Sequence, residues 1–167
     1  QWPYPKGSFP TTSSKRLYED GRFPTKTGKA NFCIDYPLGL AEPPSDEYPL
    51  ILTIGRYLSH WHTMTRTSKV QKLSKKNPEP LLEINSKDAL SLAIKNDETV
   101  QIKSKRGKVK AKVHITDKIK VGTVFLPMHW GFSQKNMCEV NSLMHEKSCP
   151  ISKQPELKAC SVIIIPN

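Results

Sequence analysis

Thr99-Val100-Gln101-Ile102-Lys103-Ser104 and Gly107-Lys108-Val109-Lys110-Ala111-Lys112-Val113-His114-Ile115 are two segments in which apolar and polar residues alternate. A period of two is typical of β-strands that turn one face to a core and the other to solvent. The short stretch Lys105-Arg106-Gly107 between them fits a tight turn. The sequence from 99 to 115 therefore predicts a β-hairpin and favours a mainly β protein.

Apolar segments on both sides of this hairpin predict further strands. They cover residues 48–53, 81–85, 123–127 and 161–165, and the last is almost entirely apolar. After the second of them, Ser86 can cap a short helix with apolar residues at 89, 90 and 93, which Asn96-Asp97 would end. Together these elements predict a small closed β barrel of six to seven strands with one or two short helices.

Residues 1–47 differ from the rest of the chain. They are rich in Pro, Gly, Ser and Thr and show no sustained apolar period, with Asp20-Gly21 as a hairpin-type turn pair. We expect an irregular arm over 1–47 that packs on other domains, followed by the barrel over 48–167. A first residue of Gln1 in place of Met favours a fragment of a larger protein.

The strongest chemical signal is the polar stretch from Ile54 to Arg66, which follows the predicted strand 48–53. A glycine lets backbone amides approach a ligand closely, arginines bind phosphate oxygens with two parallel hydrogen bonds, and Trp or His rings stack on a heterocycle. These properties favour a loop that binds a dinucleotide. The candidate residues are Ile54, Gly55, Arg56, Ser59, His60, Trp61, His62, Thr63, Thr65 and Arg66, with the hydroxyl of Thr67 beside them.

Two other interpretations of this loop remain open. His60 and His62 share one face of an extended segment and would suit zinc, but two further ligands are needed and no Cys-x-x-Cys or His-Glu-x-x-His motif supplies them. We therefore predict no metal site. Alternatively, the loop is only polar surface whose aromatic residues pack on the barrel.

Charge, cysteines and hydropathy limit the classes of protein. Lys and Arg outnumber Asp and Glu by 26 to 15, a net charge of +11 that attracts anions, whether an anionic substrate or an acidic protein partner. The lysines are scattered and not interleaved with aromatic residues, so we expect no nucleic-acid partner, and a solvated surface explains them equally well. The four cysteines fit no zinc or disulfide framework, which favours reduced thiols and a cytoplasmic location, and no run of about 20 apolar residues predicts a membrane span.

Six ordered motifs resemble the C-terminal region of molybdopterin-dependent nitrate reductases. The likeness is greatest to the assimilatory, ferredoxin-dependent enzymes, and it covers essentially the whole chain. The motifs are Asp20-Gly21-Arg22-Phe23-Pro24-Thr25 with Gly28, Ile54-Gly55-Arg56, His60-Trp61-His62-Thr63 with Thr65-Arg66, Pro127-Met128-His129-Trp130, Asn141-Ser142-Leu143, and Gln154-Pro155-Glu156-Leu157-Lys158-Ala159-Cys160.

The resemblance implies a double-psi β barrel that binds one guanine dinucleotide of molybdenum bis(molybdopterin guanine dinucleotide). In that family the segment matching 54–63 wraps the dinucleotide, and the residues matching Asn141 and Lys158 contact the cofactor. Met128, His129 and Trp130 become candidates for the substrate funnel. A pyrophosphate beside Gly55, Arg56 and Lys158 is what the charges of those residues also favour.

For the whole enzyme the resemblance implies reduction of nitrate to nitrite in nitrate assimilation. A [4Fe-4S] cluster, the molybdenum-ligating cysteine and the catalytic residues would lie in other domains, so we expect no catalytic residue here and no turnover by these 167 residues alone. Expected partners are those domains, nitrate and an acidic ferredoxin. The alternatives are the equivalent domain of another molybdopterin oxidoreductase, such as a formate dehydrogenase, or a freestanding β-barrel recognition module.

Overall fold

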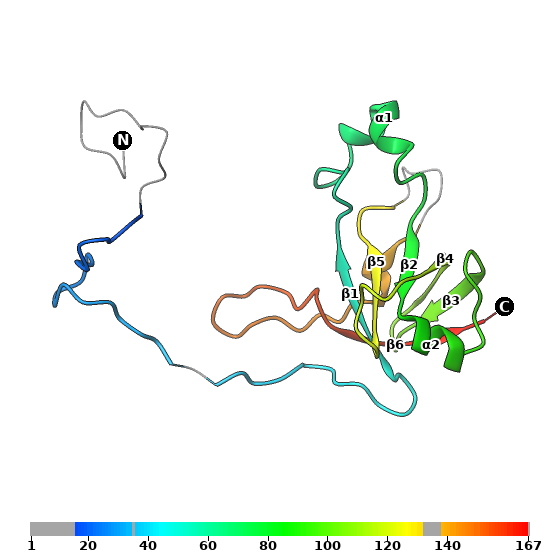
Figure 1. Ribbon diagram of the computed structural model, residues 1–167. Helices are drawn as coiled ribbons and strands as arrows, with labels where there is room; N and C mark the ends of the chain where they lie inside the picture. The colour runs from blue at the N-terminus through cyan, green and yellow to red at the C-terminus, as the bar shows by residue number, and fades with distance from the viewer. Residues whose placement is uncertain (1–15, 35, 132–137, 167) are drawn as a thin grey trace. The chain divides into compact units, whose positions relative to one another are not determined.

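The computed structural model describes residues 16–34, 36–131 and 138–166 (Figure 1). The chain divides into two units, residues 1–38 and 39–167. In the described part of the first unit there are turns and bends but no helix or strand. Gly21 adopts a φ of 70° and donates its N–H to the Tyr18 carbonyl at 2.9 Å. The Asp20-Gly21 pair is thus in a turn, but no strands flank it within the described residues, so it does not close a hairpin.

The second unit is a closed barrel of six strands in the order β1-β5-β2-β4-β3-β6 (Figure 1). Pairs β1/β5 and β2/β4 are parallel and the other neighbours are antiparallel. This architecture confirms the predicted mainly β fold, a double-psi β barrel. The strands are β1 Leu50–Gly55, β2 Leu81–Ile84, β3 Thr99–Lys103, β4 Lys108–Ile115, β5 Thr123–Pro127 and β6 Cys160–Ile165.

The alternating pattern of the sequence sets which side chains fill the barrel. In β1, β2, β3 and β5 every second residue is buried. Leu52, Leu82, Val100, Val113 and Val124 have no exposed surface at all. Each such side chain contributes about 1.5–3 kcal/mol of transfer free energy. The core therefore supplies a rigid support for the loops at the strand ends.

The predicted hairpin is confirmed, because β3 and β4 pair antiparallel around a turn in which Ser104 N–H donates to the Gly107 carbonyl at 2.9 Å. The helix after β2 differs in detail from the prediction. Helix α2 covers Ser86–Ser91, and Asn85 caps it by accepting from the Lys87 N–H, while Ser86 donates to Asp117. The helix ends well before Asn96 because Ala93 takes a left-handed φ of 53°.

Three more short helical turns lie in the described parts of the connections. They are η1 Thr67–Lys69 and α1 Gln71–Ser74 between β1 and β2, and η2 Val140–Leu143 between β5 and β6. Because β1 and β5 are parallel, the connections that follow them leave the barrel at the same end, where α1 lies (Figure 1). Residues that follow β1 are thereby brought near residues that follow β5.

Candidate dinucleotide-binding site

The loop after β1 begins with a close approach between Gly55 and its neighbours. A Cβ on Gly55 would lie 3.1 Å from Phe125 Cε2 and 3.6 Å from Lys158 Nζ. The Lys158 ammonium donates a hydrogen bond to the Ile54 carbonyl. The Gly55 carbonyl accepts a hydrogen bond from the Met128 N–H at 2.8 Å. Ile54 itself is 2% exposed, so its side chain belongs to the core and only its backbone faces the loop. The predicted residues Gly55 and Lys158 are thus neighbours, 103 positions apart in sequence (158 minus 55).

One side of the loop is exposed to solvent. The guanidinium carbon of Arg56 lies 5.2 Å from the centre of the Trp61 ring, a cation–π contact, and Trp61 is 60% exposed. His62 packs edge-on against Trp61 with ring centres 4.5 Å apart. Thr63, Thr65 and Arg66 are exposed too. This side therefore offers a cation, an aromatic face and hydroxyl groups to a ligand.

The other side of the loop is packed against the chain. His60 is only 4% exposed, and its Nδ1 lies 3.1 Å from the Thr67 hydroxyl, which also accepts from the Trp61 N–H at 3.2 Å. The Ser59 hydroxyl accepts from the Asn77 amide at 2.5 Å. His60 and His62 therefore differ in burial, and no group of three or more His, Cys, Asp or Glu residues suited to a metal occurs within the described residues.

Four of the predicted residues line one cavity of about 400 Å³, namely Thr63, His129, Trp130 and Asn141. They come from the connections after β1 and β5 and from η2. Burial lowers the pKa of His129, and the nearby His62 lowers it further, so the neutral ring is favoured there. His129 also takes a left-handed φ of 73°, an uncommon conformation for a residue with a side chain.

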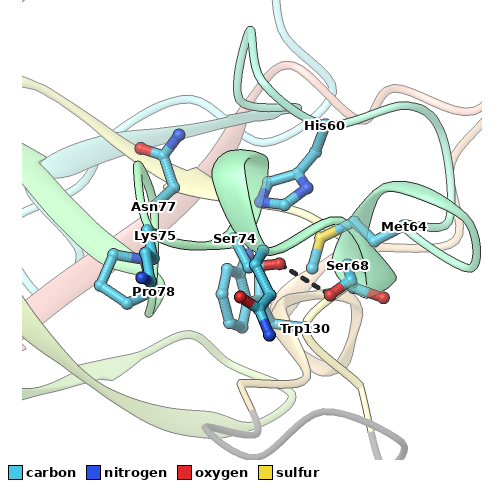
Figure 2. A pocket seen from close by; sticks show the side chains of 9 residues that line it. His60, Met64, Ser68, Ser74, Lys75, Asn77, Pro78 and Trp130 are labelled. Atoms are coloured by element: carbon cyan, nitrogen blue, oxygen red, sulfur yellow. Dashed lines mark hydrogen bonds between the residues drawn. The ribbon is translucent and has the colours of Figure 1, made fainter.

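A second cavity of about 330 Å³ lies between the packed side of the loop and α1 (Figure 2). Its lining residues are His60, Met64, Ser68, Gln71, Ser74, Lys75, Asn77, Pro78 and Trp130. The ring of His60 points toward the side where Ser74 and Trp130 lie (Figure 2), and the His60 and Trp130 ring centres are 6.3 Å apart at 90°. Two predicted residues therefore meet in this second space.

Several residues of these sites were not predicted from the sequence. Gln71, Lys75 and Asn77 line the second cavity, but η1 and α1 are too short to show an apolar period. Tyr57 was also missed; its hydroxyl accepts from the Leu81 N–H at 2.9 Å and donates to the Glu79 carbonyl at 3.4 Å. Burial raises the pKa of Tyr57 to about 12, so the phenol stays neutral and joins the loop to β2. An aromatic residue next to Gly55-Arg56 was the only available signal.

Cys33, Cys138, Cys149 and Cys160 are free thiols, and burial raises the pKa of Cys138 to about 11. Among the described residues, no helix has both the length and the apolar character needed to cross a membrane.

A closed β barrel with a polar loop and two cavities beside the ends of parallel strands defines the chain as a ligand-binding β-barrel domain. Residues 50–161 match the family described as Molydopterin dinucleotide binding domain. That match spans more than half of the chain, so the chain belongs to this family. The resemblance found in the sequence is confirmed.

Relatives extend over nearly the whole chain. It is 52% identical to "Nitrate reductase" of Synechocystis sp. over 99% of its length, which is 24% of that protein. It is 40% identical to "F420-dependent formate dehydrogenase subunit alpha" of Methanocaldococcus jannaschii, covering 92% of the chain and 22% of the relative. For "Assimilatory nitrate reductase catalytic subunit" of Bacillus subtilis the identity is 34%, over 99% of the chain and 22% of the relative. The chain thus spans about a quarter of the length of these curated relatives.

One solved structure, acetylene hydratase from Pelobacter acetylenicus, is similar with a TM-score of 0.64 at 21% identity. The match covers 72% of this chain and 19% of that one, and it supports the fold.

The residues present fit the dinucleotide that the family binds. Trp61 offers an exposed ring, the Lys158 ammonium lies beside Gly55, and Asn141 lies at a cavity. Stacking surface, cation and polar groups are the features that a nucleoside diphosphate needs.

Proposed function

We propose that this chain is the cofactor-binding domain of a molybdenum nitrate reductase, in which it holds one guanine dinucleotide of the bis(molybdopterin guanine dinucleotide) cofactor. The observation that carries this proposal is the meeting of Thr63, His129, Trp130 and Asn141 around one cavity. The 52% identity to a nitrate reductase over nearly the whole chain supports the choice of enzyme.

The loop residues would act by binding and orienting the cofactor. Arg56, stacked on Trp61, and Lys158, held by the Ile54 carbonyl, supply positive charge for a diphosphate, while the Trp61 ring offers a surface for the base. A charge-assisted hydrogen bond of this kind contributes about 1.5–3 kcal/mol. When bound, the molybdenum cofactor supplies the oxygen-atom and electron transfer that converts nitrate to nitrite.

The remaining parts of the enzyme would cover the exposed apolar residues of the loop. Leu58 and Val70 are exposed, as is Trp61, although all three are hydrophobic. Large apolar side chains that a segment leaves exposed are suited to packing against another surface. We infer that residues 1–47 and this loop pack on the other domains, which would carry the [4Fe-4S] cluster and the molybdenum ligand, and that Met128, His129 and Trp130 line the substrate funnel.

The positive charge suggests the electron donor. A net charge of +11 favours the docking of an acidic ferredoxin and attracts nitrate, in an enzyme of cytoplasmic nitrate assimilation. Reversing the charge of exposed lysines on the hairpin, such as Lys108 and Lys110, should weaken the salt dependence of electron transfer from ferredoxin. An unchanged salt dependence would exclude this docking surface.

A second candidate is the same role in a formate dehydrogenase, favoured by the 40% identity to such a subunit over 92% of the chain. The two candidates share the dinucleotide site and differ in the substrate. Assays of the complete enzyme with nitrate and with formate distinguish them.

The binding proposal is tested by an amide NMR titration of the 167-residue chain with GDP, with ADP as the matched control. GDP carries the base and the diphosphate of the guanine dinucleotide. We expect shifts at residues 54–67, 141 and 158 that are larger with GDP than with ADP. Equal shifts with both nucleotides, spread over the lysine-rich hairpin, would contradict the proposal and indicate simple attraction of anions.

A further inference from the structure

Two buried nitrogen atoms in the second cavity have no hydrogen-bond partner among the described residues. They are His60 Nε2 and Trp130 Nε1; both residues line the cavity and are 4% and 5% exposed, and the two nitrogens themselves have almost no surface open to solvent. A third such atom, His145 Nε2, lies elsewhere and is 3.2 Å from the Glu156 carboxylate, so it has a charged neighbour. Leaving a buried polar group without a partner costs about 1–3 kcal/mol. Two such groups at one cavity therefore indicate a ligand.

The ligand must accept hydrogen bonds. The indole nitrogen of Trp130 is only a donor. At His60, the Thr67 hydroxyl accepts a hydrogen bond from the Trp61 N–H and lies 3.1 Å from His60 Nδ1. Its hydroxyl hydrogen can therefore be donated to Nδ1. In that arrangement, which uses both the acceptor and the donor capacity of the Thr67 hydroxyl, the imidazole proton is on Nε2 and makes it a donor too.

The charge of the cavity favours an anion. Lys75 lines it, and none of its described lining residues is a carboxylate. Gln71, Ser68 and Asn77 add polar groups, while Met64 and Pro78 make part of the wall apolar. A volume of about 330 Å³ admits a phosphate-sized group together with water.

We propose that the cavity between the loop and α1 binds an oxyanion, held by the N–H groups of His60 and Trp130 and by the Lys75 ammonium. The oxyanion is either free in solution or a phosphate group of a nucleotide, and the second source rests on the proposed function. The exposed cations Arg56 and Arg66 are not part of this site. The solvent-exposed side of the loop would then bind the base, and the packed side would bind an anionic group.

The indole N–H signals of Trp130 and Trp61 in an ¹⁵N NMR titration of the 167-residue chain test the proposal. Inorganic phosphate, nitrate and GDP are added separately at constant ionic strength, with chloride as the reference salt. We expect a saturable downfield shift of the Trp130 signal with at least one oxyanion, while phosphate and nitrate leave Trp61 unchanged. A Trp130 signal that does not move, or that moves equally with chloride, overturns the proposal.

Lys75→Gln and Lys76→Gln form a matched pair, because Lys76 is exposed and does not line the cavity. Loss of one charged partner should weaken oxyanion binding about tenfold in Lys75→Gln. Lys76→Gln should bind like the unaltered chain. Equal affinities of the two variants would overturn the role of Lys75 and with it the site.

GDP separates this inference from the proposed function. Saturation by phosphate or nitrate without tighter binding of GDP identifies a free oxyanion as the ligand. Tighter binding of GDP, with shifts at residues 54–67 as well as at Trp130, identifies a nucleotide phosphate. Shifts at 54–67 without any change at Trp130 leave the proposed function standing and overturn the inference.

Discussion

The cluster around Arg106 and the cavity beside His60 and Trp130 both contain polar side chains that lie against the barrel. They differ in how many of their polar atoms have hydrogen-bond partners. Arg106 binds the Glu42 carboxylate through both terminal nitrogens, at 3.0 and 2.7 Å. It also donates to the Leu143 carbonyl at 3.1 Å and to Cys160 Sγ at 3.3 Å. In the cavity, by contrast, two buried nitrogens have no partner among the described residues.

This difference separates a structural role from a binding role. A polar group that is fully paired within the chain stabilises the fold, and its removal leaves its partners unpaired. A polar group that the chain leaves unpaired lowers stability until a ligand supplies the partner. Removing a donor should therefore cost much stability at Arg106 and little at the cavity, and the following predictions test that contrast.

Arg106→Met should have the largest effect. It leaves the Glu42 carboxylate, 13% exposed, without its paired guanidinium and leaves the Leu143 carbonyl with the Cys160 thiol as its donor. We expect the free energy of unfolding in urea to fall by about 2–3 kcal/mol. Lys105→Met is the matched control, because Lys105 is 56% exposed and lies 4.0 Å from Glu42, so its loss should cost less than about 0.5 kcal/mol. Similar losses for both variants would contradict the structural role of Arg106.

Gly107→Ala should have a somewhat smaller effect in the same region. An added Cβ would lie 2.7 Å from the backbone oxygen of Ser142, so η2 would have to move. We expect a loss of about 1–3 kcal/mol, with weaker GDP-induced shifts at Asn141, which belongs to the same turn. Gly131→Ala serves as the control because no atom of the described residues lies within 4 Å of its added Cβ. A Gly107→Ala variant as stable as the Gly131→Ala variant would show that η2 is not held in this position.

The contribution of the Arg106–Glu42 pair to stability should decrease as the pH falls. The hydrogen bond from Arg106, assisted by the charge of its guanidinium and opposed by burial, holds the pKa of Glu42 below its ordinary value of 4.5. Because the folded pKa is the lower one, the stabilisation is complete above the ordinary value and is lost as pH falls through the folded pKa. The stability difference between the unaltered chain and Arg106→Met should therefore shrink from pH 6 toward pH 3, and urea unfolding at several pH values measures it. A constant difference over that range would exclude the pair as its cause.

The sequence predicted the barrel, because its strands follow from local patterns, whereas local patterns reveal only part of how the loop after β1 is packed. Alternation over residues 99–115 specifies one buried face, and this local pattern is enough to predict β3 and β4. The turn chemistry after Gly55 likewise marked a polar loop. The ends of helix α2 were predicted wrongly, because neighbouring polar residues compete to cap it. Asn85 and not Ser86 is its N-cap, and Ala93 ends the helix before Asn96.

The polar partnerships could not be predicted because they join residues far apart in the sequence. Glu42 and Arg106 meet across 64 positions, and Lys158 reaches the Ile54 carbonyl across 104. Nor does any local pattern show that His60 and Trp130 share a cavity while His62 faces solvent. Such contacts follow from the closure of the barrel and the register of its strands, which is tertiary information.

Trp130→Phe should have the smallest effect on stability, and it is the sharpest test of the contrast. The substitution removes an indole N–H that has no partner among the described residues, so the recovered desolvation cost of about 1–3 kcal/mol offsets the packing lost with the smaller ring. We expect a net change below about 1 kcal/mol. Tyr57→Phe removes a hydroxyl that accepts from the Leu81 N–H at 2.9 Å, so it should cost about 1–2 kcal/mol although less volume is lost. If the cavity binds an oxyanion, phosphate should stabilise the unaltered chain more than Trp130→Phe in the same urea experiment, because binding to the folded state adds to its stability. A Trp130→Phe loss larger than that of Tyr57→Phe, with equal stabilisation by phosphate, would mean that Trp130 serves packing alone.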